Sequence, residues 1–228
     1  MAGPRTQADL SDAVGRDLTW RVREISDLRT AARRADANLC NTIVRAGVTL
    51  LAAHWEGHVR FVAEQYLAFL TMRKPRFRNL KPAFLLGKFH AYFLPGGMPS
   101  GYGDRIAFLS KVQDAPSDRF SQYPQALVGT RSNLRADVLK DICHALSLDP
   151  DHFASDTDFI DRILIHRRNA IAHGEQMTID LTDFIEMSDH TIDIMRRFKN
   201  IVENEITLEA YRLKPPASLG QSDRVGRP

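Results

Sequence analysis

The residues with the clearest chemical potential in this chain of 228 residues lie between Arg168 and Gly174, in the stretch Arg-Asn-Ala-Ile-Ala-His-Gly. Arginine offers a permanently charged, planar fork of donors for phosphate oxygens. Histidine can transfer protons near neutral pH. Asn169 precedes His173 by four residues, so a helix brings both side chains to one side, where we expect the amide to hold the imidazole ring. These residue types suit the chemistry of a phosphate ester.

A helical wheel separates polar from apolar residues around this stretch. With Ile160 at zero and about 100° per residue, the apolar face consists of Phe159, Ile160, Ile163, Leu164, Ala170 and Ile171. The polar face carries Arg162, His166, Arg168, Asn169 and His173. Arg167 lies within the apolar stripe, which favours a structural ion pair or a dimer contact for this residue.

The rest of the sequence supplies amphipathic helices that must position this stretch. We expect long helices over 9–37 and 39–72, interrupted at Asn38, with the second at the centre of the core. Shorter helices are predicted over 83–92, 104–112 and 133–146, the last capped by Ser132 or Asn133. A capping box of Ser155 and Asp158 should begin the helix that Gly174 ends, and a last helix should cover 182–205.

No segment predicts a strand, so the expected fold is all-α, an up-and-down bundle of four to five long helices. We predict a flexible arm over 1–8 and a helical domain over 9–212 with an insert at about 75–128. The segment 213–228 is rich in proline, glycine and serine, which indicates a disordered tail.

Composition excludes several classes of protein. The net charge is only +3, with a pI of about 9.0, which is too mild to establish a nucleic-acid partner. The two cysteines, Cys40 and Cys143, have no metal-ligand spacing. The sequence shows neither an apolar signal core nor the roughly 20 apolar residues of a membrane span. We therefore expect a cytoplasmic protein without a membrane partner.

The segment from His54 to His58 has the four-residue spacing of many metal-binding histidine pairs. Its glutamate, Glu56, is third in the segment, whereas the zinc-protease motif needs it second. We expect these side chains to pack and to form internal hydrogen bonds, and we predict no metal site. His54 and Glu56 remain candidates for the border of the functional site.

The element from Arg168 to His173, followed by Gly174 and a long helix, resembles the signature of the HEPN superfamily. Ala53–Gly57, Ser132–Leu134 and Val138–Lys140 resemble its MAE-type branch, and the RiboL-PSP-associated branch is the alternative. The resemblance covers most of residues 9–205. It implies a helical bundle and, in many members, a metal-independent endoribonuclease that acts as a toxin or in defence against phage.

The resemblance assigns catalytic roles to Arg168 and His173 and a supporting role to Asn169, without any cofactor. RNA is cleaved in this chemistry by attack of the 2′-hydroxyl. The motif of each chain supplies one histidine, so a homodimer with two converging motifs is expected. RNA is the implied substrate, and an antitoxin or another defence component is an implied partner. The alternative is a non-catalytic HEPN module that binds a partner protein or RNA through the same face.

A basic run lies between residues 71 and 82, which include five cations and no acid. Its cations suit phosphate contacts, and Phe77 suits stacking on a base. The alternative is a solvated connector. The candidate RNA contacts from the sequence are Arg73, Lys74, Arg76, Arg78, His166 and Arg167.

Overall fold

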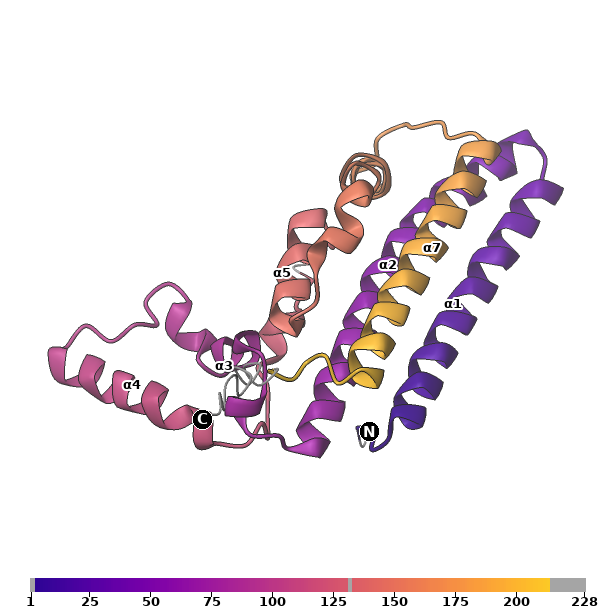
Figure 1. Ribbon diagram of the computed structural model, residues 1–228. Helices are drawn as coiled ribbons and strands as arrows, with labels where there is room; N and C mark the ends of the chain where they lie inside the picture. The colour runs from indigo at the N-terminus through magenta and orange to yellow at the C-terminus, as the bar shows by residue number, and fades with distance from the viewer. Residues whose placement is uncertain (1–2, 131–132, 214–228) are drawn as a thin grey trace, which may run out of the picture.

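The computed structural model describes residues 3–130 and 133–213, and this part of the chain is all-α (Figure 1). Three long helices lie side by side: α1 (Gln7–Arg34), α2 (Ala37–Arg73) and α7 (Leu181–Thr207). The described residues contain no strand, only two isolated β-bridges. The all-α prediction is confirmed, although the bundle has three long helices where four to five were expected.

The start of α1 is fixed by its own sequence. Thr6 Oγ1 accepts a hydrogen bond from the Asp9 N–H at 3.0 Å, and the Asp9 carboxylate accepts one from the Thr6 N–H at 2.9 Å. This capping box satisfies donors that would otherwise lack partners at the helix terminus. Pro4 is buried. The helix therefore begins within the segment 1–8, which was expected to be a flexible arm.

The helix α2 is the centre of the core, as its apolar sequence predicted. Its fully buried side chains include Val44, Val48, Leu51, Trp55, Val59, Val62, Tyr66 and Leu70. Contacts between the helices fix their directions. Arg29 of α1 pairs with Asp189 of α7, whereas Gln7 bonds to Thr207, so α1 and α7 are antiparallel. The break between α1 and α2 lies at Ala35 and Asp36, because Asp36 caps α2 by accepting from the Leu39 N–H.

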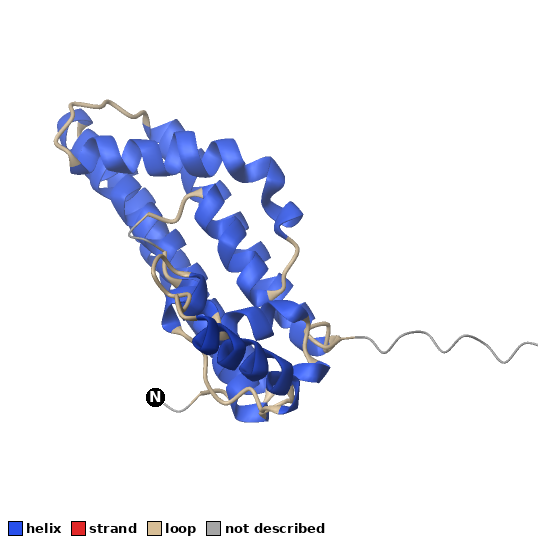
Figure 2. Ribbon diagram, turned by 90° about the vertical axis from the view of Figure 1, so that its left-hand side faces the viewer, coloured by secondary structure: helices blue, strands red, loops and turns tan. Residues whose placement is uncertain are grey.

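The insert forms a lobe that projects from one end of the bundle (Figure 1), and this lobe faces the viewer in Figure 2. It comprises η1 (Phe77–Asn79), α3 (Pro82–Lys88), η2 (His90–Phe93), α4 (Tyr102–Asp114), η3 (Ala115–Ser117) and η4 (Gln125–Val128). Phe89, Phe108 and Ala115 form its own small core.

At the end of the described chain, the Leu213 N–H donates to the Asn79 carbonyl at 3.0 Å. The rest of the tail predicted to be disordered, 214–228, lies outside the described residues.

The elements around the motif are α5 (Ala136–Leu146), η5 (Pro150–Asp156), the π-helix η6 (Phe159–Ile165) and α6 (His166–Ala172). The expected capping box at Ser155 is absent from the described structure, because η5 leads directly into η6. A π-helix has more residues per turn than an α-helix. The wider turn buries Ile165 and leaves Ile163 36% exposed. The helical wheel, which placed Ile163 on the apolar face, was therefore wrong for Ile163.

No helix in the described residues is both long and apolar enough to cross a lipid bilayer.

Candidate functional site

Two amide side chains hold the guanidinium group of Arg168. Its Nη1 donates to Asn133 Oδ1 at 3.0 Å and to Asn169 Oδ1 at 2.9 Å. Asn169 is the neighbouring residue, whereas Asn133 comes from the segment before α5. Within residues 3–130 and 133–213, Nε and Nη2 make no hydrogen bond. The guanidinium is thus oriented by neutral acceptors, and most of its donors remain available to an anion.

Asn133 is a site residue that the sequence analysis missed. Its position before α5 suggested a helix cap, but α5 begins at Ala136 and has no side-chain cap. The Ala136 N–H donates instead to Asp161 Oδ1 at 2.8 Å. The amide of Asn133 is therefore free to bond to Arg168. A local capping pattern could not reveal this contact, because its partner lies 35 residues away.

His173 stands directly after the last residue of α6, and its side chain is exposed. Its backbone N–H donates to the Asn169 carbonyl at 2.9 Å. Gly174 follows in the left-handed region, with φ +83°, and ends the helix as expected. In the described part of the chain no side chain bonds to the imidazole ring. Both ring nitrogens are therefore available for proton transfer.

The role expected for Asn169 differs from the one observed. The spacing suggested that its amide holds the ring of His173. In the structure the Asn169 amide oxygen accepts from Arg168, and only its backbone carbonyl contacts His173. The adjacent arginine is charged, and hydrogen bonds from charged donors are the stronger ones. Asn169 thus orients the guanidinium group and leaves the imidazole ring unrestrained.

An open polar depression of about 670 Å³ lies beside the motif. It is lined by Arg135, Thr157, Asp158, Asp161, Arg162, His166 and Asn169. His166 is exposed here, on the same helix as Asn169. The depression carries both signs of charge: Arg162 pairs with Asp158, and Arg135 lies 3.6 Å from Asp161. The motif therefore borders an open, polar surface.

A comparison with known protein families gave a match. The sequence matches the RiboL-PSP-HEPN family over residues 16–204. The chain belongs to this family. The match runs from α1 to α7 and includes the insert and the motif. No curated protein and no solved structure matched the chain.

Within this HEPN bundle, Arg167 points away from the face that carries Arg168. Its Nη2 lies 3.3 Å from the Asp183 carboxylate, and its Nη1 contacts the sulfur of Met187 at 3.2 Å. Both partners belong to α7. The expectation of a structural ion pair is met by Asp183. Arg167 consequently joins α6 to α7, which does not favour its candidate role in RNA binding.

The histidines of α2 belong to a buried network between α1 and α2. His58 Nδ1 lies 2.6 Å from the Asp17 carboxylate, and Arg21 contacts the same carboxylate at 2.8 Å. His54 Nε2 lies 2.9 Å from Glu24, and its Nδ1 lies 3.5 Å from Arg21. His54 and His58 are 3% and 0% exposed. His54 therefore serves the packing of α1 on α2, and it does not border the motif.

Burial and neighbouring charges both shift the pKa values in this network. Burial raises the pKa of Asp17, but hydrogen bonds from His58 and Arg21 outweigh it and hold that pKa below its ordinary value. Burial lowers the pKa of His54; Glu24 opposes this shift, and the charge of Arg21 adds to it. Gly57 admits the guanidinium, since a Cβ there would lie 2.8 Å from Arg21 Nη1.

Glu56 faces a different part of the molecule from the network. Its carboxylate accepts a hydrogen bond from the Thr130 hydroxyl. The chain then continues from Thr130 through 131–132 to Asn133, which holds Arg168. Glu56 thus supports the segment that carries Asn133.

Among the described residues, no group of three or more histidine, cysteine, aspartate or glutamate side chains could hold a metal ion.

The basic run lies at the C-terminal end of α2, where Arg73 is the last residue of the helix and Lys74 follows in the left-handed region. Phe77 is only 5% exposed and packs against Phe120, with ring centroids 5.6 Å apart. The expectation that Phe77 stacks on a base was therefore wrong, because its ring is already enclosed by protein. Arg73, Lys74 and Arg78 are exposed and Arg76 is partly exposed.

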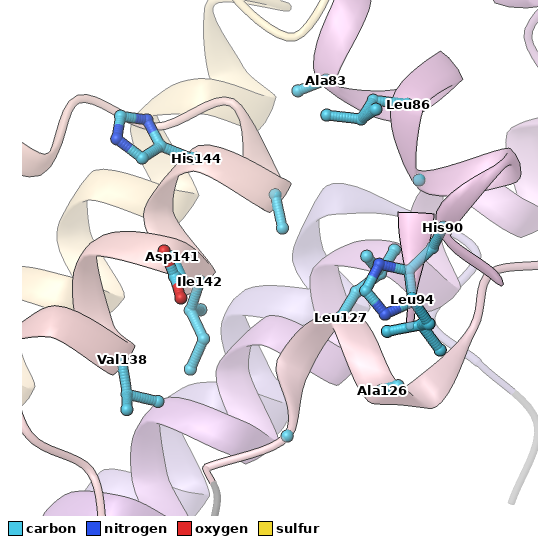
Figure 3. A pocket seen from close by; sticks show the side chains of 13 residues that line it. Ala83, Leu86, His90, Leu94, Ala126, Leu127, Val138, Asp141, Ile142 and His144 are labelled. Carbon is cyan, nitrogen blue, oxygen red and sulfur yellow. The ribbon is translucent and has the colours of Figure 1, made fainter. Parts of the chain in front are cut away.

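A second hollow, of about 630 Å³, lies between the insert and α5 (Figure 3). Its lining is mostly apolar and includes Leu86, Leu94, Leu127, Val138 and Ile142. His90 lies on the insert side and His144 on α5 (Figure 3). No residue of the motif contributes to it.

Proposed function

We propose that this HEPN chain is a metal-independent endoribonuclease in which Arg168 and His173 are the catalytic residues. The arrangement of Arg168 is the observation that supports the proposal most. Two neutral amides orient its guanidinium group, and no carboxylate in the described residues neutralises it. Such an oriented cation suits a phosphate group, because its charge is not already consumed.

The reaction follows from the chemistry of RNA. The 2′-hydroxyl attacks the adjacent phosphorus atom and gives its proton to a base. The bond from phosphorus to the 5′-oxygen breaks, and that oxygen receives a proton from an acid. The products are a 2′,3′-cyclic phosphate and a 5′-hydroxyl. His173 supplies an imidazole ring as the proton-transfer group, and Arg168 stabilises the negative charge on the phosphate in the transition state.

A homodimer would complete this site. The motif of one chain offers one histidine, whereas the reaction needs both a base and an acid. The exposed ring of His173 and the open depression beside Asn169 leave this face accessible to a second copy. Two-fold pairing would bring two copies of the motif together.

We further propose that the nuclease is a toxin or a phage-defence component that acts with an antitoxin or another partner protein.

A second candidate function is a non-catalytic module that binds a protein or RNA through the same face. The exposure of His173 favours it, because the ring does not line the depression beside the motif. The two functions differ in whether His173 takes part in a chemical step. If the chain is a non-catalytic binding module, loss of the His173 imidazole would not change RNA cleavage.

The test is to incubate the protein with mixed RNA in EDTA, beside a His173→Ala variant, and to identify the product ends chemically. Cleavage that leaves 2′,3′-cyclic phosphates and is lost in the variant is the expected result. Cleavage that persists unchanged in the variant would exclude His173 from the reaction. No cleavage by either protein would favour the binding module.

A further inference from the structure

Two distant segments of the chain pair with each other at the C-terminal end of α2. The chain reverses at Lys74, where φ is +48°. The Phe77 N–H then donates to the Asp118 carbonyl at 3.0 Å, and the Phe120 N–H donates to the Pro75 carbonyl at 2.8 Å. These bonds form an antiparallel bridge in which Arg76 lies opposite Arg119 (Arg76↔Arg119).

The bridge places arginine on one side and phenylalanine on the other. Successive side chains of extended backbone alternate between faces. Phe77 and Phe120 are buried together, so Arg76 and Arg119 share the outer face. Arg76 and Arg119 form a non-hydrogen-bonded pair of the antiparallel bridge, and the Cα atoms of such a pair are about 4.5 Å apart. Like charges directly opposite each other repel, and a bound anion would relieve this repulsion.

Five cations gather here: Arg73, Lys74, Arg76, Arg78 and Arg119, which we call the basic end. The Arg119 guanidinium donates to the Lys74 carbonyl at 3.2 Å, which ties the bridge to the end of α2. Nearby carboxylates are engaged elsewhere, in the pairs Asp118–Lys88, Glu205–Lys81 and Glu209–Arg212. Among residues 3–130 and 133–213, no carboxylate forms an ion pair with any of the five cations.

The basic end is separate from the motif. The Trp55 indole donates to the Leu134 carbonyl at 3.1 Å, and Leu134 is next to Asn133, which holds Arg168. Arg73 lies 18 residues further along α2 than Trp55. At 1.5 Å per residue, this distance is roughly 27 Å along the helix axis. The same side chains therefore cannot serve both places.

We propose that the basic end binds the phosphate backbone of RNA at a distance from the motif. This inference rests on RNA being the substrate of the proposed function. The five cations can contact phosphates, whereas Phe77 is buried and unable to stack on a base. The contact is therefore independent of base sequence. A stacked strand advances about 3.4 Å per phosphate, so reaching from the motif to the basic end takes roughly eight nucleotides.

The experiment measures the binding of a fluorescent 30-nucleotide RNA between 50 and 300 mM salt. All proteins carry His173→Ala, so that the RNA stays intact. The test variant is Arg76→Gln with Arg119→Gln. The control is Arg33→Gln with Arg34→Gln, which removes two exposed cations at the far end of α1. A third variant, Arg76→Lys with Arg119→Lys, keeps the charge, and thermal unfolding checks that each protein is folded.

Loss of two phosphate contacts should reduce the slope of log K against log salt by about 1.4. Binding at 0.1 M salt should then weaken roughly 25-fold, equally for RNAs of different sequence. The lysine variant and the α1 control should bind like the parent protein. Unchanged binding by the glutamine variant, or an equal loss in the α1 control, would overturn the proposal. Binding of an acidic peptide in place of RNA would also overturn it.

This binding experiment and the cleavage assay together separate the two proposals. RNA binding that depends on Arg76 and Arg119, together with no cleavage by the native chain, would support RNA binding at the basic end and overturn the proposed nuclease. Cleavage that depends on His173, together with RNA binding that is unchanged when the two arginines are replaced, would support the nuclease and overturn RNA binding at the basic end.

Discussion

His54 and His58 in α2 have the same four-residue spacing as Asn169 and His173. The α2 pair is buried, and each histidine has a carboxylate partner within 3 Å. His173 is exposed, and no side chain in the described residues bonds to its ring. A buried polar group must be paired to avoid the cost of desolvation, and both buried histidines already have charged partners. An exposed group at a helix end keeps its capacity for chemistry.

The same contrast separates the arginines of the two regions. Arg21 uses its guanidinium group on Asp17 and on the backbone of α2. Within the described residues, Arg168 bonds only to neutral amides. A carboxylate would neutralise the charge that a phosphate needs, whereas an amide oxygen orients the guanidinium without neutralising it. Spacing alone shows neither difference, because both depend on which residues lie opposite.

The largest expected effect concerns the stability of the α1–α2 network. His58→Ala removes one partner of the buried Asp17 carboxylate, and we expect a loss of about 3 kcal/mol in the free energy of unfolding. The matched control is His173→Ala, for which we expect a change within about 0.5 kcal/mol because the side chain is exposed. Urea unfolding followed by circular dichroism measures both. Equal losses in the two variants would refute the contrast between the regions.

The next effect concerns the orientation of Arg168. Asn133→Ala removes one acceptor from the guanidinium, and we expect RNA cleavage to fall about tenfold, which corresponds to about 1.4 kcal/mol. Asn133→Asp keeps an acceptor but adds a negative charge that competes with the phosphate, so it should raise KM more than the alanine variant does. Steady-state cleavage kinetics give both parameters.

The aspartate variant distinguishes orientation from simple structural support. If Asn133 only held the fold together, the aspartate would replace it and activity would remain normal. Asn169→Ala provides the parallel measurement, since this amide contacts the same Nη1. Full activity in all three variants would show that the amide pair does not matter.

The smallest effect is a dependence of stability on pH that originates at His54. Its pKa is lowered by burial in the folded chain, with Glu24 opposing the shift and Arg21 adding to it, while the unfolded value is near 6.5. Below about pH 6.5 the unfolded chain therefore binds more protons, and stability falls as the pH falls. One site contributes at most about 1.4 kcal/mol per pH unit.

The measurement compares urea unfolding of the native chain and His54→Gln at pH 7.5, 6.0 and 5.0. The advantage of the native chain over the variant should shrink as the pH falls. Asp17, whose pKa is also lowered, affects stability only below its ordinary value of 3.8, so it does not contribute in this range. A constant difference between the two proteins would contradict the assignment to His54.

Much of the fold followed from local patterns. The periodicity of apolar residues placed the long helices, and Gly174 marked the end of the motif helix because glycine readily adopts positive φ. The capping signals were less informative: Ser155 caps nothing in the described structure, and Asn133 serves Arg168. The π-helix was missed because its wider turn results from packing, and the sequence contains no separate signal for it.

By itself, the sequence determined the all-α fold, the central position of α2 and the residue types of the motif. These features follow from hydrophobic periodicity and from side-chain chemistry, which are local properties. The tertiary structure decided the contact between Asn133 and Arg168, the burial of His54 and the placement of Arg119 opposite Arg76. These contacts join residues between 33 and 43 positions apart. Only the packing of whole helices and of the insert brings such residues together.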